Sequence, residues 1–188
     1  MKKIIAVLLL ILLFCSCQND IPGGIKSFDD YKKELSAEEI KKARANAGNE
    51  LAERPDENIC YVTVNCQKAV ESSELNETMR SILPKDGIVL DRYEVRYDDG
   101  ASAFDVILKA VKDNKIHMEY TGSKKAPYIE GAVNLYEFDC GALSGWMYRV
   151  NGWSPSFGMG QYEIERGDMI ELIYSCELGK DIGDNYME

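Results

Sequence analysis

One glycine-punctuated stretch, residues 140–162, constrains the fold more than any other part of this 188-residue chain. It reads CGALSGWMYRVNGWSPSFGMGQY and holds two tryptophans, three further aromatic residues and five glycines. Glycine lets a backbone turn sharply, and large aromatic side chains in such places either fill a core or form a contact surface. Within the stretch, Asn151-Gly152 is a strong signal for a two-residue hairpin turn. The stretch predicts a strand and a hairpin turn, followed by an aromatic segment whose role other features must decide.

The N-terminus has the form of an export signal. Lys2 and Lys3 make a short basic region, and an unbroken apolar run follows from Ile4 to Phe14. That run is short for a transmembrane helix and has the length of a signal-peptide core. We therefore expect the mature protein to be exported.

The end of the apolar run, Phe-Cys-Ser-Cys at residues 14–17, resembles a bacterial lipobox. Cys17 fits best as the lipidated residue because the small Ser16 precedes it, whereas the bulky Phe14 would precede the alternative, Cys15. We expect a lipoprotein signal peptide at residues 1–17 and a lipid anchor in the cell membrane, with the protein facing outside the cytoplasm. An ordinary secretory signal is the alternative.

The charge balance excludes one class of partner. The chain has 22 basic and 32 acidic residues, a formal net charge of −10. Removing Lys2 and Lys3 with the signal leaves 20 against 32, or −12. No basic patch or stripe remains, so we expect no nucleic-acid binding and assign membrane attachment to the lipid.

Residues 18–57 are typical of a tether that carries one peripheral helix. Ser36 to Glu39 has capping-box spacing, and Pro55 ends the pattern. Between them, apolar residues recur at helical intervals along a narrow, alanine-rich face: Ile40, Ala43, Ala47 and Leu51. The folded domain is therefore expected at residues 58–183, with a tail at 184–188.

The domain has a strand-rich pattern with one clear helix, which Ser102 caps and which runs to about Asn114. Residues 67–83 are predicted to be a loop or short helix. Strands are predicted from the alternation of apolar residues at residues 60–66, 93–97, 116–120, 146–150 and 170–176. A helix between strand pairs, closed by a last strand, predicts an α+β fold with a β-grasp-like mixed sheet. The first and last strands would then lie side by side and parallel.

Four cysteines, Cys60, Cys66, Cys140 and Cys176, remain after processing, in a compartment that permits disulfides. Their spacing does not resemble a zinc site, so no metal is expected. Cys60 and Cys66 are roughly 20 Å apart along one strand, too far for a bond to each other. We prefer Cys66–Cys176, which leaves Cys60–Cys140, and the opposite pairing stays open.

The sequence offers little for catalysis. It has one histidine, His117, and Ser144-Gly145 lacks the pattern of a nucleophile elbow. No phosphate-binding or dinucleotide loop is present. We therefore expect a protein that is not an enzyme and carries no cofactor.

Several ordered motifs resemble one bacterial family of unknown function, which is similar to the C-terminal domain of transcobalamin and intrinsic factor. The strongest match is Gly-Trp-Met-Tyr at residues 145–148 followed by Val-Asn-Gly at 150–152. Supporting segments lie at residues 128–131, 136–141 and 174–179, and the resemblance extends from about Ile59 to Gly183. The resemblance implies a β-grasp-like fold on an exported or surface-anchored protein.

In the vertebrate relatives this domain closes over one face of cobalamin, beside a large helical domain. We expect no such helical partner within the present sequence, which has no pattern for one. A corrinoid would therefore need a second chain or domain to bury its other face.

Four aromatic residues are the predicted contact residues: Trp146, Tyr148, Trp153 and Phe157. Trp146 and Tyr148 share strand parity and fill the core in an alternative interpretation, whereas Trp153 and Phe157 follow the turn and are harder to bury. Two functions follow. One is a binding module that docks protein or glycan at the envelope, and the other is a corrinoid-like small-ligand module that needs a second chain.

Overall fold

The computed structural model describes residue 54 and residues 56–184. The predicted signal peptide, the lipidation site Cys17 and the predicted tether helix lie outside this part of the chain. Within the described residues, no helix is both long and apolar enough to cross a membrane.

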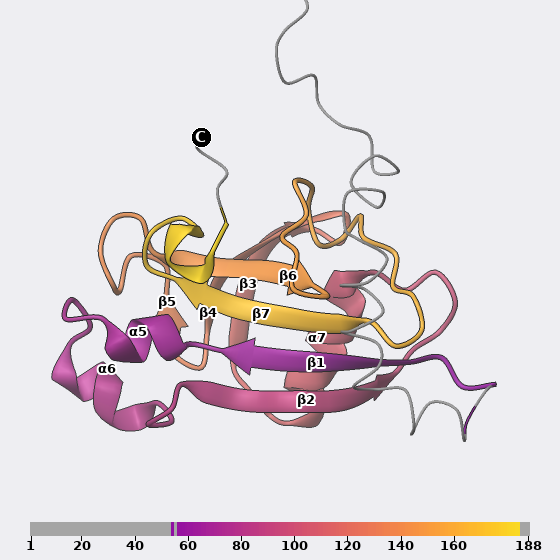
Figure 1. Ribbon diagram of the computed structural model, residues 1–188, viewed down its shortest axis with the longest axis horizontal. Helices are drawn as coiled ribbons and strands as arrows, with labels where there is room; N and C mark the ends of the chain where they lie inside the picture. Colours follow the sequence, from indigo (N-terminus) through magenta and orange to yellow (C-terminus); the bar gives the residue numbers. More distant parts are fainter. Residues whose placement is uncertain (1–53, 55, 185–188) are drawn as a thin grey trace, which may run out of the picture. The chain divides into compact units, whose positions relative to one another are not determined.

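A four-stranded mixed sheet forms the centre of the domain (Figure 1). Its strands lie in the order β2 (Ile88–Arg96), β1 (Ile59–Asn65), β7 (Met169–Ser175) and β6 (Gly145–Val150). β1 and β7 are parallel, and each edge strand is antiparallel to its neighbour. The first and last strands therefore occupy the middle of the sheet, which confirms the predicted α+β, β-grasp-like arrangement.

The alternating pattern of β1 places its two sets of side chains in separate apolar clusters. Cys60, Val62 and Val64 are fully buried in the main core, while Ile59 and Tyr61 form a smaller cluster on the other face. A strand that is apolar on both faces is suited to the middle of a sheet. This explains why β1, rather than a more polar strand, lies at the centre.

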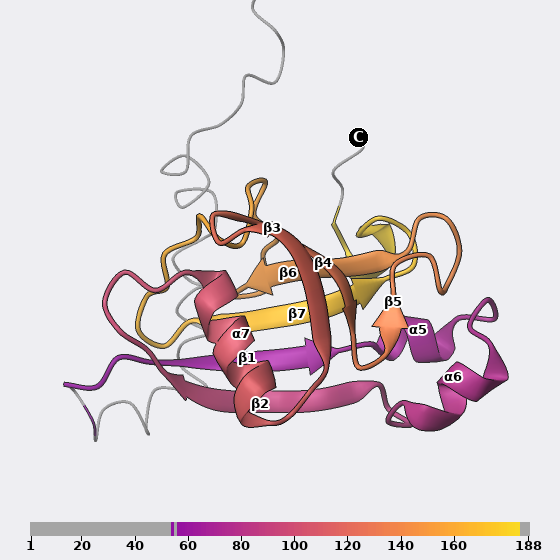
Figure 2. The same ribbon diagram turned by 180° about the vertical axis from the view of Figure 1, so that it is seen from behind.

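The helix α7 (Ala103–Asp113) packs against the central sheet, on the face turned toward the viewer in Figure 2. Its start is fixed by a capping box between Ser102 and Asp105, and Ser102 is the cap that the sequence predicts. Its buried side carries Ala103, Phe104, Val106, Ile107, Ala110 and Val111. The helix thus closes the main core over β1, β2 and β7.

A second, three-stranded sheet lies beside α7 (Figure 2). It consists of β3 (Met118–Ser123), β4 (Ala126–Ala132) and β5 (Leu135–Tyr136). The sequence predicts only β3, two residues early, because β4 contains Pro127 and Gly131 and has little apolar alternation. Gly131 is required by packing, since a Cβ there would lie 2.5 Å from the Tyr136 ring.

The connection between β1 and β2 forms two short helices, α5 (Gln67–Glu71) and α6 (Glu77–Ile82). Asn76 caps α6 by accepting a hydrogen bond from the Met79 amide at 2.8 Å. The Arg80 guanidinium donates to the backbone carbonyls of Val70, Ser72 and Leu75 and so holds the connection together. A single 3₁₀ turn, η1 (Lys180–Ile182), follows β7.

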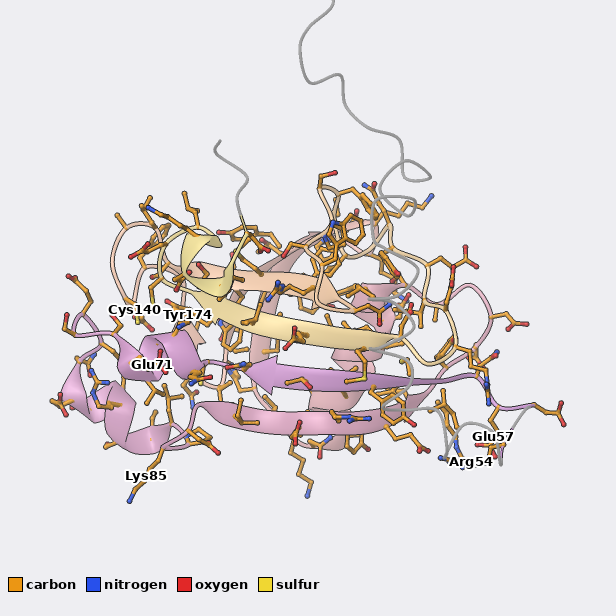
Figure 3. All side chains as sticks on the ribbon, viewed as in Figure 1. Arg54, Glu57, Glu71, Lys85, Cys140 and Tyr174 are labelled. Atoms are coloured by element: carbon orange, nitrogen blue, oxygen red, sulfur yellow. The ribbon has the colours of Figure 1, made fainter. Side chains whose placement is uncertain are left out.

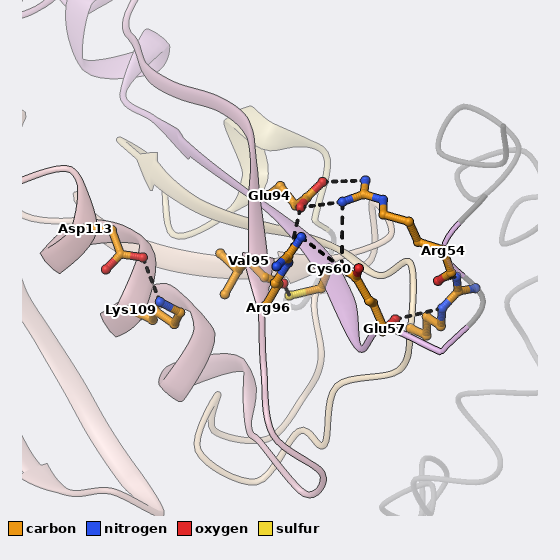
Figure 4. Close-up of polar contacts among 9 residues, drawn as sticks. Arg54, Glu57, Cys60, Glu94, Val95, Arg96, Lys109 and Asp113 are labelled. Atoms are coloured by element: carbon orange, nitrogen blue, oxygen red, sulfur yellow. Dashed lines mark hydrogen bonds and ion pairs between the residues drawn. The ribbon is translucent and has the colours of Figure 1, made fainter. Parts of the chain in front are cut away.

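At the opposite end of the sheet, ion pairs fix the start of the described chain (Figure 4). The Arg54 guanidinium donates to both carboxylate oxygens of Glu94 on β2, at 2.9 and 2.8 Å. The hydrogen bond from Arg54 holds the pKa of the Glu94 carboxyl below its ordinary value. Arg96 pairs with Glu57 at 3.0 Å, so two strong contacts tie the entry of β1 to the edge strand.

Candidate functional site

The first half of the aromatic stretch belongs to the core. In β6, Trp146, Tyr148 and Val150 point inward and are no more than 9% exposed. The Trp146 Nε1–H donates to the Leu135 carbonyl at 2.9 Å, and its ring meets Tyr174 edge-on at 5.3 Å. Trp146 therefore has a packing role here rather than the predicted role in ligand contact.

Tyr148 has a different structural role. Its ring is 8% exposed, and its hydroxyl donates to the Phe157 carbonyl at 2.7 Å. This bond joins the central sheet to the segment after the hairpin turn. Tyr148 thus supports the predicted contact residues, and its own side chain is buried.

The predicted hairpin turn is present at Asn151-Gly152, where both residues have positive φ angles of 53° and 79°. Val150 and Trp153 exchange backbone hydrogen bonds of 2.7 and 3.0 Å, which close the two-residue turn. The pairing ends there, because residues 154–168 form no second strand. The chain instead leaves the sheet as an irregular loop.

We define residues 153–162 as the aromatic loop. Trp153 and Phe157 lie on it with ring centroids 6.3 Å apart, and Phe157 stacks on Tyr162 at 6.2 Å. Trp153 and Phe157 are partly buried, whereas Tyr162 is buried. The three rings form a continuous aromatic row that runs from the core to the surface.

The aromatic loop is held by bonds to other elements. The loop carbonyls of Met159 and Tyr162 accept from the amides of Phe104 and Ala103, at the free N-terminus of α7, at 3.1 and 2.8 Å. Ser154 donates a hydrogen bond to the Asp184 carboxylate, beyond η1. These bonds fix the loop from the helix side and from the C-terminal side.

A buried carboxylate anchors the base of the loop. Asp168 has no exposed surface, and its two oxygens accept from the Asn151 side-chain amide at 2.9 Å and the Glu165 amide at 2.8 Å. Asn151 in turn accepts from the Met169 amide at 2.9 Å. The hairpin turn and the turn into β7 are therefore locked to each other through one carboxylate.

The cysteines do not form the predicted bridges. All four described cysteines are free thiols, so neither Cys66–Cys176 nor Cys60–Cys140 is bonded. The parallel register pairs Asn65 with Ile173, which puts Cys66 level with Tyr174 and leaves Cys176 two residues further along. Cys60 lies at the other end of β1, where its thiol donates to the Val95 carbonyl at 3.7 Å. The predicted pairing is therefore wrong because of a two-residue offset in register.

The structure instead brings Cys140 next to Cys176. Both cysteines and Ser72 line the same groove, and each thiol affects the pKa of the other. Figure 3 shows Cys140 and Tyr174 together above Glu71 on α5. We call Cys140, Cys176 and Ser72 the thiol cluster.

Burial raises the pKa of both thiols in the cluster. The pKa of Cys176 rises to about 12, chiefly by desolvation and then by the neighbouring Cys140. Desolvation also raises the pKa of Cys140, although the polar side chains of Cys176 and Ser72 partly oppose the rise. Both thiols are therefore protonated at neutral pH.

The thiol cluster lies in an open groove of about 560 Å³. Its rim is mainly acidic, with one lysine: Glu71, Glu74, Glu177, Asp181 and Lys68. The sequence did not predict this groove, because its residues come from three segments that are far apart in the chain. Among the described residues, no group of three or more His, Cys, Asp or Glu side chains is placed to hold a metal ion.

Comparisons with known proteins give a family over part of the chain. Residues 100–175 match the model of the family described as Domain of unknown function (DUF4430). No curated protein is significantly similar in sequence.

Two solved structures illustrate the structural similarities that were found. Haptocorrin in complex with Cbi has 20% sequence identity to this chain and a TM-score of 0.45. The similarity covers 65% of this chain and 26% of the haptocorrin chain, so this chain spans about a quarter of haptocorrin's length. A candidate metal-binding protein from Ruminococcus gnavus ATCC 29149 is 17% identical with a TM-score of 0.38, over 63% of this chain and 97% of that one. The predicted resemblance to a family of unknown function is thus confirmed over residues 100–175, which match DUF4430.

Proposed function

We propose that this protein is a non-enzymatic, exported lipoprotein whose folded domain is a binding module at the cell envelope. Cys17 would carry the lipid that anchors the chain in the membrane, and the aromatic loop would dock a protein or a glycan. One observation carries the proposal. Trp153 and Phe157 are only partly buried, yet they lie on a loop that hydrogen bonds to β6 and α7 hold in place.

Pre-organisation is what makes this loop suited to recognition. The Phe157 carbonyl is fixed by Tyr148, and the Met159 carbonyl is fixed by α7. A loop ordered during folding does not have to be ordered again on binding, so less of the interaction energy is lost. Rigid aromatic side chains supply large contact areas at low entropy cost and dominate many interfaces.

The position of the loop favours an extended partner. In Figure 1 the chain after β6 projects beyond the end of that strand as a raised loop. Small-molecule sites are concave and bury most of the ligand, whereas two partly exposed aromatic side chains on a projecting loop suit a protein or a glycan. A corrinoid bound here would leave one of its faces exposed unless a second chain covered it. The test below therefore includes a corrinoid among the ligands.

The test compares three forms of the mature chain, residues 18–188. The immobilised wild type is screened against purified cell-wall glycans, envelope proteins and cobinamide, and each binder is then titrated against the double variant W153A/F157A. Loss of two central aromatic contacts should weaken binding by roughly 30-fold or more, the effect of removing about 2 kcal/mol. The control is Phe138→Ala, which removes another aromatic side chain, 62% exposed, outside the aromatic loop.

The melting temperature of each variant is measured first, so that loss of fold is separated from loss of contact. A W153A/F157A protein that stays folded and binds as tightly as the wild type would refute the site. Tight binding of cobinamide by the chain alone would replace the docking proposal with the small-ligand function.

A further inference from the structure

The two cysteines of the thiol cluster lie on segments that the sheet brings together. The antiparallel register pairs Gly145 with Ser175, which puts Ser144 level with Cys176. Cys140 folds back onto the same place, since its amide donates to the Ser144 hydroxyl at 3.1 Å and the Ser144 amide donates to the Gly141 carbonyl at 3.0 Å. The neighbouring backbones are also joined, through the Leu178 amide and the Leu143 carbonyl, at 3.0 Å.

The other two described cysteines are buried and hydrogen-bonded elsewhere, although Cys66 lies near enough to Cys140 for that thiol to contribute to its raised pKa. Cys60 is fully buried at the far end of β1. Cys66 is also fully buried, and its thiol donates to the Gly87 carbonyl at 3.3 Å. Cys176, by contrast, is partly exposed in the open groove, and Cys140 beneath it is 3% exposed.

We propose that Cys140 and Cys176 are a disulfide site, which on oxidation cross-links the loop before β6 to the end of β7 while Cys60 and Cys66 stay reduced. The oxidant is a small disulfide. The Cys176 thiolate attacks one of its sulfurs and releases one thiol, and the Cys140 thiolate then displaces the second thiol from the mixed disulfide. The two protons and two electrons of the cysteines leave on the two released thiols.

The cross-link would act on a surface rich in exposed apolar side chains. Phe138 and Leu143 on one tied segment are 62% and 53% exposed, and Leu178 on the other is 49% exposed. Closing a loop of about 37 residues restricts the unfolded chain and should raise the melting temperature by roughly 5–15 °C. The oxidised form would therefore hold these apolar side chains in one arrangement.

Trypsin separates the cysteines in a way that makes the test decisive. The mature wild-type chain is treated with a small disulfide, blocked with iodoacetamide under denaturing conditions, and digested without reductant. Cys140 then lies in the peptide 126–149 and Cys176 in 167–180, while Cys60 and Cys66 share 45–68. The expected product is 126–149 joined to 167–180, with loss of two hydrogen atoms, beside a doubly alkylated 45–68.

Two results would overturn the proposal: a cross-link from 45–68 to either other peptide, or all four cysteines alkylated after exposure to the oxidant. Cys140→Ser and Cys176→Ser should each lose the rise in melting temperature on oxidation, whereas Cys66→Ser should keep it. If Cys66→Ser also lost the rise in melting temperature on oxidation, the assignment of the disulfide to Cys140 and Cys176 would be contradicted. The wild-type peptide map decides the question even if a variant fails to fold.

The acidic rim predicts which oxidant works faster. At equal concentration and low salt, the dication cystamine should form the cross-link faster than the anionic oxidised glutathione, and added salt should reduce the difference. Because thiolate is the nucleophile, the rate should rise about tenfold per pH unit between pH 7 and 9. Equal rates for the two oxidants at low salt would show that the reacting thiol lies outside the acidic groove.

Discussion

At the scale of single residues, Asp168 links two turns of the chain. Its sequence context, Gly-Asp before a strand, indicates only a turn, and the structure shows a fully buried carboxylate that receives donors from two different loops. A buried carboxylate stabilises a fold only while hydrogen-bond donors face its oxygens. Asp168 therefore determines the geometry at the base of the aromatic loop.

Asp168→Asn should reduce the free energy of unfolding by about 2–3 kcal/mol. The new amide group would direct a donor at the Asn151 side-chain amide or at the Glu165 amide, each of which is itself a donor. Urea unfolding measures the loss. Asp113→Asn is the control, because Asp113 pairs with Lys109 on the surface and should cost little. Equal small losses in the two variants would contradict the anchoring role.

The two tryptophans show what sequence can decide at this scale. Trp146 and Trp153 lie seven residues apart in one aromatic-rich stretch, and composition cannot separate them. Strand parity places Trp146 and Tyr148 on one face, but which face is inward depends on the second sheet that supplies the Leu135 carbonyl. That sheet has too weak a pattern to be predicted, so the contact role of Trp146 could not be decided from sequence.

At the scale of elements, α7 is the one most fully determined by local sequence. Its cap at Ser102, its apolar side and its end near Asn114 are all present as the sequence predicts. Partial burial raises the pKa of Asp105, but the hydrogen bonds from Ser102 outweigh it and the pKa lies below its ordinary value. At pH values above the ordinary aspartate pKa, the ionised Asp105 carboxylate therefore stabilises the folded protein. This stabilisation is lost as the pH falls through the lower pKa that Asp105 has in the folded state.

Ser102→Ala should cost about 1 kcal/mol of stability at neutral pH, because the amide of Asp105 loses its acceptor. The difference between wild type and variant should shrink in acid, below pH ~4, as Asp105 takes up its proton. Urea unfolding at several pH values checks both points. Ser156→Ala, at an exposed position, is the matched control, and a cost independent of pH would contradict a cap that depends on the carboxylate.

Elements that depend on register were harder to predict than α7. Apolar alternation correctly predicts β1 and β7 and their parallel pairing, because central strands need apolar side chains. It cannot predict that Cys66 lies level with Tyr174 rather than with Cys176, a shift of two residues that keeps the same face. The disulfide prediction failed for this reason.

At the scale of the whole molecule, the two ends of the sheet have different surfaces. One end carries the acidic groove and its thiols, formed by α5, the loop before β6 and the segment after β7. The aromatic loop leaves the other end of β6 and is held by α7 and by Asp184. The proposed docking site and the proposed disulfide site can therefore be tested independently.

The most direct measurement is made on the two tryptophan indole N–H signals of the ¹⁵N-labelled mature chain. The strongest binder among the tested glycans and envelope proteins is added to saturation. We expect the Trp153 signal to shift while the Trp146 signal, whose N–H donates to the Leu135 carbonyl, stays in place. A Trp153 signal that does not move at saturation would contradict the claim that the aromatic loop is the binding surface.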